Sequence, residues 1–268
     1  MLLGHPRQIE DLSTRMKRNL KLLAVSATTA ITCGVIAQTV PLQNATATFS
    51  QTFFANLSVA FAIDDNPLTG WAIGTENSTK SETAVFETVE DIQLASAKEL
   101  VFRLKCGAFL GAQFNNIGRF RLSATSDDRS EFADGLPTGG DVTANWEVLE
   151  PLVFTSASGA ILTKLADNSL LASGVNPPDS ETYTVIATSK LTRITGFRLE
   201  TMEDDSLPDR GPGRSFNGNF VLYDFSVGLA GKVVSGTRRS NKFKSLTWAI
   251  TPPFLNRARI PFPSDFTG

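Results

Sequence analysis

The sequence predicts an all-β protein. Short apolar runs alternate with polar residues, glycine, proline and threonine recur between the runs, and no long helical pattern appears beyond the N-terminus. The runs Leu100–Leu104 and Phe120–Ala124 show the alternation, each with an arginine between a phenylalanine and a leucine. A period of two gives a strand one buried face and one exposed face. The glycine- and asparagine-bearing segment 107–118 between the two runs is typical of a loop.

The composition excludes several kinds of chemistry. The chain has 268 residues, enough for one large or two small domains. Phenylalanine outnumbers tyrosine 19 to 2, which predicts a core of flat apolar rings. The single histidine, His5, precedes a predicted export signal, so the exported chain would have none. That excludes Ser-His-Asp and Cys-His catalysis, histidine metal ligands and c-type haem attachment.

The N-terminus has the pattern of a secretory signal. Met16–Lys21 is basic, and no charged residue occurs from Leu22 to Ile63. We expect residues 1–37 to be an upstream extension and signal peptide, with cleavage after Ala37 and an extracytoplasmic product; a buried N-terminal helix is the alternative. The apolar part is too short and too polar for a stable membrane span. Cleavage would leave Cys106 as the only cysteine, which predicts a core residue and no internal disulfide.

Three predicted strands recur later in the chain. The pairs are offset by 99, 95 and 100 residues: Ser81–Phe86 with Ser180–Val185, Leu100–Leu104 with Thr195–Leu199, and Gly118–Ser123 with Gly218–Tyr223. A near-constant offset indicates a repeat. It predicts two tandem β-sandwich modules, residues 38–126 and 146–228, joined by a linker at 127–145. One large sandwich made of two halves is the alternative.

The segment Ala62–Ile73 reads A-I-D-D-N-P-L-T-G-W-A-I. It resembles the signature of discoidin-type (coagulation factor 5/8 type C) modules, which are galactose-binding-like β-sandwiches. The resemblance implies a jelly-roll fold with ligand-binding loops. Asp65 stands where that family usually has glycine, so the tight loop depends on a residue that rarely adopts a positive φ.

Other blocks look like β-domains of planctomycete proteins that carry cytochrome c-like and PSD1 domains. These are Leu42–Gln51, Gly70–Ile73, Gly118–Ser123 and Gly211–Leu222. In that family the last block usually comes first, and this chain has no CxxCH motif. The resemblance therefore implies no haem here.

Asp64, Asn66 and Thr69 are the predicted metal ligands. Oxygen side chains at short spacing suit calcium, and discoidin-like modules often hold a structural calcium at this loop. The alternative is an Asx turn, in which the carboxylate accepts hydrogen bonds from backbone amides. Three ligands fall short of calcium's usual shell, so carbonyl oxygens or a remote acid such as Asp224 would have to complete it.

Trp71, Arg119 and Arg214 are the predicted ligand-binding residues. Trp71 is interpreted as a sugar-stacking platform, with a core aromatic as the alternative. Arg214 lies in Gly211–Leu222, which lacks the phosphate-loop pattern. Its alternative is a tight connection in which the arginine pairs with an acid or a carbonyl.

The predicted function is binding of carbohydrate or another surface ligand by an exported, non-catalytic protein, in which loops at one end of the sandwich carry recognition. The alternatives are a jelly-roll polysaccharide-degrading enzyme, with Tyr183 or Tyr223 as its phenol, and an architectural module of a larger planctomycete-type cell-envelope protein. Residues 38–230 carry a net charge of −11 and residues 231–268 of +6. We expect 229–268 to be a poorly ordered basic, proline-rich tail, and no nucleic-acid partner.

Overall fold

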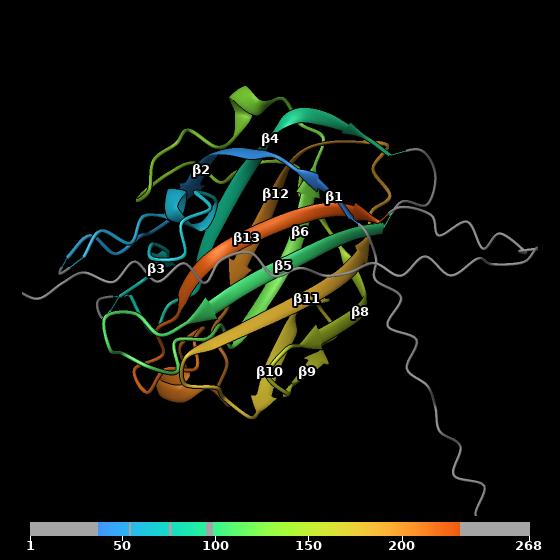
Figure 1. Cartoon of the computed structure of the whole chain (residues 1–268). Coiled ribbons are helices and arrows are strands. Elements are labelled where there is room, and N and C mark those ends of the chain that lie inside the picture. Colours follow the sequence, from blue (N-terminus) through green and yellow to red (C-terminus); the bar gives the residue numbers. More distant parts are fainter. Residues whose placement is uncertain (1–36, 54, 75–76, 95–98, 231–268) are drawn as a thin grey trace, which may run out of the picture. The chain divides into compact units, whose positions relative to one another are not determined.

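The computed structural model describes residues 37–53, 55–74, 77–94 and 99–230. These residues form two antiparallel sheets packed face to face (Figure 1), which confirms the predicted all-β sandwich. The strands are β1 (Ala37–Val40), β2 (Leu42–Ala47), β3 (Trp71–Ala72), β4 (Glu82–Gln93), β5 (Glu99–Gly107), β6 (Arg119–Thr125), β7 (Glu147–Val148), β8 (Glu150–Ser156), β9 (Ala160–Lys164), β10 (Leu170–Gly174), β11 (Ser180–Thr188), β12 (Arg193–Thr201) and β13 (Val221–Ala230). Short 3-10 helices η1 (Val59–Ala62), η2 (Arg129–Glu131) and η3 (Pro208–Arg210) lie in the connections.

The first sheet has the order β1-β13-β5-β11-β8, with β3 paired to β13. The second has the order β2-β4-β12-β6-β10-β9, with β7 paired to β6. No helix in the described part of the chain has the length and apolar character that crossing a bilayer requires. Most of the predicted signal and most of the predicted tail fall outside the described residues. Ala37, the predicted last residue of the signal, begins β1, and Leu229 and Ala230, predicted as part of the tail, end β13.

The strand order corrects the prediction of two tandem modules. Within the described residues, β4, β5 and β6 never pair with one another; each pairs with strands from the second half of the chain. β5 lies between β11 and β13, and β12 lies between β4 and β6. Residues 38–126 and 146–228 are therefore not separate sandwiches. They are interleaved halves of one, which is the alternative that the sequence left open.

The predicted repeat is present as an approximate two-fold relation between the sheets. Its matched strands are β4 with β11, β5 with β12, and β6 with β13. Exchanging each strand for its match turns the trio β11-β5-β13 of the first sheet into the trio β4-β12-β6 of the second. Phe102 and Phe197 occupy matched positions, and their rings meet edge to face with centroids 5.4 Å apart. The repeat thus places equivalent side chains opposite each other at the centre of the core.

The core is rich in aromatic rings, as the composition predicts. Phe86 stacks on Phe225 with centroids 4.5 Å apart, and Phe120 stacks on Tyr183 at 5.8 Å. Cys106 is fully buried, and burial raises the pKa of its thiol to about 12. At that pKa the thiolate is not populated near neutral pH, so Cys106 behaves as the predicted core residue.

The segment predicted as a linker, 127–145, covers the outer face of the second sheet instead. Phe132 and Ala133 form a small apolar cluster with Val85 of β4. Phe132 also meets Trp146 edge to face, with centroids 5.5 Å apart. A Cβ at Gly196 of β12 would lie 2.5 Å from the Phe132 ring, so glycine is what allows the ring to reach the sheet. The segment is held because its apolar residues have a sheet to pack on.

The Ser-Glu-Thr sequence that begins the first matched pair of segments places a glutamate near the start of both β4 and β11. Both glutamates are buried, with Glu82 at 7% and Glu181 at 1% exposure. The Glu82 carboxylate accepts hydrogen bonds from the Thr48 hydroxyl and from Asn77 Nδ2. Burial nevertheless raises the pKa of Glu82 above its ordinary value of 4.5, because desolvation outweighs these bonds.

We expect Glu82 to make stability depend on pH. A raised folded pKa means that this group's contribution is fully present below the unfolded value and is lost as the pH rises through the folded value. The wild-type free energy of unfolding, relative to that of Glu82→Gln, should therefore fall as the pH rises above 4.5, the ordinary pKa of a glutamate. Urea denaturation of both proteins on either side of this pH measures it. If the stability of the wild type relative to Glu82→Gln rises with pH, the pKa of Glu82 is not raised in the folded protein.

We also expect neither half to fold alone, because each lacks the strands that pair with its own. The full chain should show a cooperative urea transition by circular dichroism, and fragments 38–126 and 146–228 should each show none. A cooperative transition in either fragment would restore the two-module organisation.

Candidate functional site

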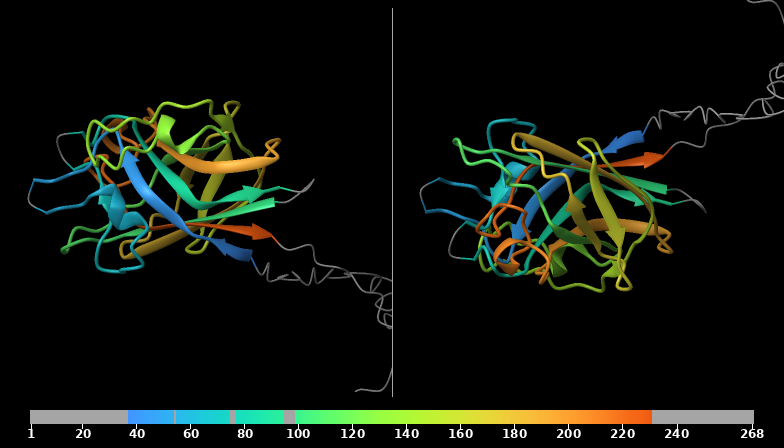
Figure 2. Two further views of the ribbon diagram at one scale, coloured as in Figure 1. Left: turned by 90° about the horizontal axis from the view of Figure 1, so that it is seen from above. Right: turned by 90° about the horizontal axis from the view of Figure 1, so that it is seen from below.

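The long loops gather at one end of the sandwich. Because the central strands β5 and β12 run antiparallel to their neighbours, their ends lie beside the starts of β4, β6, β11 and β13. Figure 2 shows the loops at the end opposite to where β1 begins and β13 finishes. The predicted ligand- and metal-binding residues all belong to segments at the loop end.

Trp71 lies in the core at this end. Its side chain is fully buried, its Nε1 donates to the Phe49 carbonyl oxygen at 3.0 Å, and its ring meets Phe220 edge to face at 5.1 Å. The ring therefore has no exposed face on which a sugar could stack. This is the core role that the sequence kept as the alternative.

The two predicted arginines bind other parts of the protein. Arg214 is 8% exposed, and its Nη1 and Nη2 each donate to a backbone carbonyl, those of Val175 and Gly174, at 2.8 Å. This is the tight connection proposed as its alternative. Arg119 forms ion pairs with Asp167 at 2.9 Å and Asp204 at 3.4 Å, and it lines a separate, acidic hollow. The structure does not bring Arg119 together with Trp71 or Arg214.

The predicted metal loop is closed by its own hydrogen bonds. Asp64 accepts from the Asn66 backbone N–H at 2.9 Å and from the Thr69 hydroxyl at 2.7 Å. Asp65 adopts the positive φ, 58°, for which the related signature uses glycine. Burial raises the pKa of Asp224, and the Asp65 charge adds to the shift, so this acid lies within electrostatic reach of the loop. No group of three acidic, histidine or cysteine side chains in the described segments is arranged to hold a metal; calcium stays a prediction.

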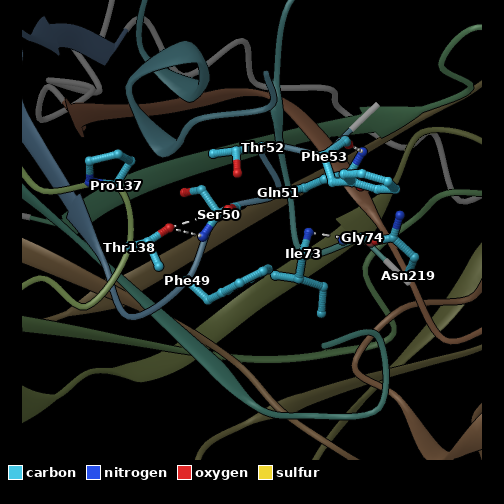
Figure 3. Close-up of a pocket in the computed structure, with 10 residues that line it drawn as sticks. All are labelled: Phe49, Ser50, Gln51, Thr52, Phe53, Ile73, Gly74, Pro137, Thr138 and Asn219. Carbon is cyan, nitrogen blue, oxygen red and sulfur yellow. Dashed lines mark hydrogen bonds between the residues drawn. The ribbon is translucent and has the colours of Figure 1, made fainter. Parts of the chain in front are cut away.

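A cavity of about 320 Å³ lies among these loops (Figure 3). None of the described residues that line it carries a charge. They come from four separate segments: Phe49, Ser50, Gln51, Thr52 and Phe53 after β2, Ile73 and Gly74 after β3, Pro137 and Thr138 from the covering segment, and Asn219 before β13. The volume lies at the lower end of the range of small-molecule sites, about 300–1,000 Å³.

One wall of the cavity is fixed by the covering segment. The Thr138 hydroxyl accepts from the Ser50 N–H at 3.1 Å and donates to the Ser50 carbonyl oxygen at 3.2 Å. Gly139 and Gly140 donate to the carbonyl oxygens of Thr48 and Ala47 at 2.7 and 3.0 Å. The segment therefore runs beside the chain after β2 like an extra strand, and it holds Pro137 at the rim.

The described lining of the cavity offers two neutral amides, three hydroxyl groups and two aromatic rings. Asn219 Oδ1 accepts from the backbone N–H groups of Ile73 and Gly74 at 3.3 and 3.1 Å. Gln51 Nε2 donates to the Phe53 carbonyl oxygen at 3.0 Å. The Phe53 side chain is 63% exposed. The backbone thus orients both amides beside a side chain that is more than half exposed.

Sequence reasoning missed these residues. Asn219 belongs to the singled-out Gly211–Leu222 block, and Gln51 ends the Leu42–Gln51 block, so both blocks did mark the site. Nothing in the sequence joined them, because Gln51 and Asn219 are far apart along the chain and meet only through the sandwich.

Comparison with known proteins found no matching family model and no matching curated protein. Solved structures with some similarity include the CpGH89CBM32-5 module of Clostridium perfringens in complex with GalNAc-β-1,3-galactose, at TM-score 0.41 and 14% identity, over 71% of this chain and 99% of that one. The family 32 module of C. perfringens NanJ in complex with galactose matches at TM-score 0.33 and 11% identity, over 72% and 98%. A chain of the Streptococcus pneumoniae β-galactosidase BgaA matches at 0.41 and 12%, over 69% and 95%. The fold assignment rests on this chain's own strand pairing; similarity at this level transfers no ligand.

We expect Asn219→Ala to destabilise the protein by about 1–3 kcal/mol, because it leaves two buried backbone N–H groups without their acceptor. Thermal and urea denaturation measure the loss. Asn56→Ala is the control, since the Asn56 side chain is exposed and makes no hydrogen bond within the described residues. Equal stability of the two variants would show that the Asn219 bonds do not hold the loop.

Proposed function

We propose that the chain binds carbohydrate at the cavity beside Phe53 and does not chemically change it. The observation that carries the proposal is an exposed aromatic ring next to neutral amides that the backbone has oriented. A sugar presents an apolar face and an edge of hydroxyl groups, which suits a ring and a small number of placed polar groups.

The character of the lining supports binding over catalysis. Glycoside hydrolysis generally uses a pair of carboxylic side chains on either side of the scissile bond. The described lining residues offer hydroxyl, amide and backbone groups, with no acid among them. The nearest tyrosine candidates for a lyase-type reaction do not line the cavity either; Tyr183 is buried, and its hydroxyl donates to the Ile117 carbonyl oxygen at 3.0 Å.

We further propose that the protein acts outside the cytoplasm. The basic and then uncharged N-terminal sequence, which precedes the described residues, supports this. An extracytoplasmic location would place the loop end of the sandwich where glycans are displayed.

Phe53→Ala should abolish or weaken glycan binding at least tenfold, because the ligand would lose about 1.5–3 kcal/mol of aromatic burial. Urea denaturation of the variant and of the wild type checks that Phe53→Ala remains folded. A glycan array with the full chain identifies ligands, and calorimetry with the best one measures affinity.

Phe216→Ala is the matched control, because Phe216 is 89% exposed in another loop and does not line the cavity. It should retain affinity. No binding to any glycan by the wild type would favour an architectural role instead. Repeating the array with added calcium tests whether the Asp64 loop needs the metal.

A further inference from the structure

We propose that the cavity recognises a sugar hydroxyl by two hydrogen bonds, one from the donor Asn219 Nδ2 and one to the acceptor Gln51 Oε1. It therefore selects neutral sugar units over those that present a carboxylate or an ammonium group at the same position. This inference rests on the proposed function, and it assigns the residues that determine specificity.

The donor end of Asn219 is set by its backbone partners. Only the amide oxygen can accept from the N–H groups of Ile73 and Gly74, so the orientation of this amide is unambiguous. Its Nδ2 is then turned the other way and donates no hydrogen bond within the described residues. Figure 3 shows the Asn219 side chain at the edge of the cavity, with its oxygen toward Gly74.

The Gln51 amide is oriented the other way, with its nitrogen bonded to the backbone and its oxygen left over. Its Nε2 must be the atom that donates to the Phe53 carbonyl oxygen at 3.0 Å, which leaves Oε1 as a free acceptor in the described part of the chain. Oε1 lies close to Gly74, since a Cβ on that glycine would stand 2.6 Å from it. Both amides therefore border the same residue, Gly74, which has φ +67°.

This pair matches a hydroxyl and mismatches charged groups. A hydroxyl both accepts and donates, so it can satisfy Nδ2 and Oε1 together. A carboxylate only accepts and would face Oε1 with its own lone pairs, whereas an ammonium only donates and would leave Nδ2 without a partner. The described lining has no charge to offset either ion, and burial of an unpaired ion is strongly unfavourable.

The test uses the full chain and monosubstituted derivatives of one hexose. The parent is the neutral hexose that binds the wild type most tightly; the derivatives replace one hydroxyl at a time by hydrogen or by an amine. At one ring position, both replacements should weaken binding by calorimetry at least about tenfold. The affinity of the neutral hexose should not change with salt or with pH in the neutral range, because no described lining group titrates there.

Gln51→Glu should reverse the preference at that position. A carboxylate in place of the amide accepts a hydrogen bond from an ammonium group. The affinity for the amino derivative should therefore rise at least about tenfold relative to the affinity for the neutral hexose. Asn219→Asp should lower the affinity for the neutral hexose by about tenfold, because the aspartate retains the acceptor for Ile73 and Gly74 but lacks the amide donor. Gln38→Glu, at an exposed position of β1 outside the lining, is the control and should change neither the affinity for the neutral hexose nor the ratio of the two affinities. Denaturation curves of each variant confirm that it is folded.

The outcomes separate this inference from the proposed function. If hexoses bind the wild type but the amino derivatives bind equally well, or Gln51→Glu leaves the ratio unchanged, the donor–acceptor assignment is wrong while sugar binding stands. If Phe53→Ala lowers the affinity and Asn219→Asp does not, binding occurs at the ring without these amides. If no hexose or glycan binds, both proposals fall.

Discussion

The fold depends on the fact that neither half of the chain can complete a sheet by itself. β5 needs β11 and β13 on its two sides, and β12 needs β4 and β6. Both central strands therefore form their hydrogen-bond ladders with strands about one repeat away in the sequence. Their matched phenylalanines, Phe102 and Phe197, then meet between the sheets. Stability of each sheet consequently requires the whole described region, and folding must bring distant segments together before either core face is covered.

The same arrangement determines the rigidity of the loop end. The connections from β5 to β6, from β10 to β11 and from β12 to β13 meet there, and buried polar groups join them. Arg214 donates to the carbonyl oxygens of Gly174 and Val175, and its own N–H donates to Asn116 at 2.8 Å. Asn116 Nδ2 in turn donates to Asn176 at 2.8 Å. Such bonds hold loops without regular structure, because they satisfy buried polar groups that no strand can pair.

Hydrogen bonds between side chains and backbone also hold the walls of the cavity. Asn219 and Thr138 each bond to the backbone of a neighbouring segment, and Gln51 bonds to the backbone of its own segment. Each bond orients a side chain that lines the cavity. A site built from neutral groups held in place can discriminate by hydrogen-bond direction and needs no electrostatic attraction. The described lining residues present hydroxyl, amide and apolar groups and no ionisable side chain.

The sequence indicated the central strands and the repeat. Alternation marked Leu100–Leu104 and Phe120–Ala124, and their predicted inward side chains, such as Phe102 and Phe120, are buried in the core. Val101 and Ser123, on the other faces of β5 and β6, are also buried, which the alternation did not indicate. For Arg214 the sequence predicted ligand binding and left a bond to an acid or a carbonyl as the alternative; the structure has the carbonyl bonds. The pairing of the strands became visible in the fold alone, because alternation specifies the face that a strand buries and not the neighbour at its edge. For the same reason the interleaving of the halves and the cavity around Gln51 and Asn219 could not be predicted. Four segments distant in sequence build that cavity, and their contact is a consequence of the pairing.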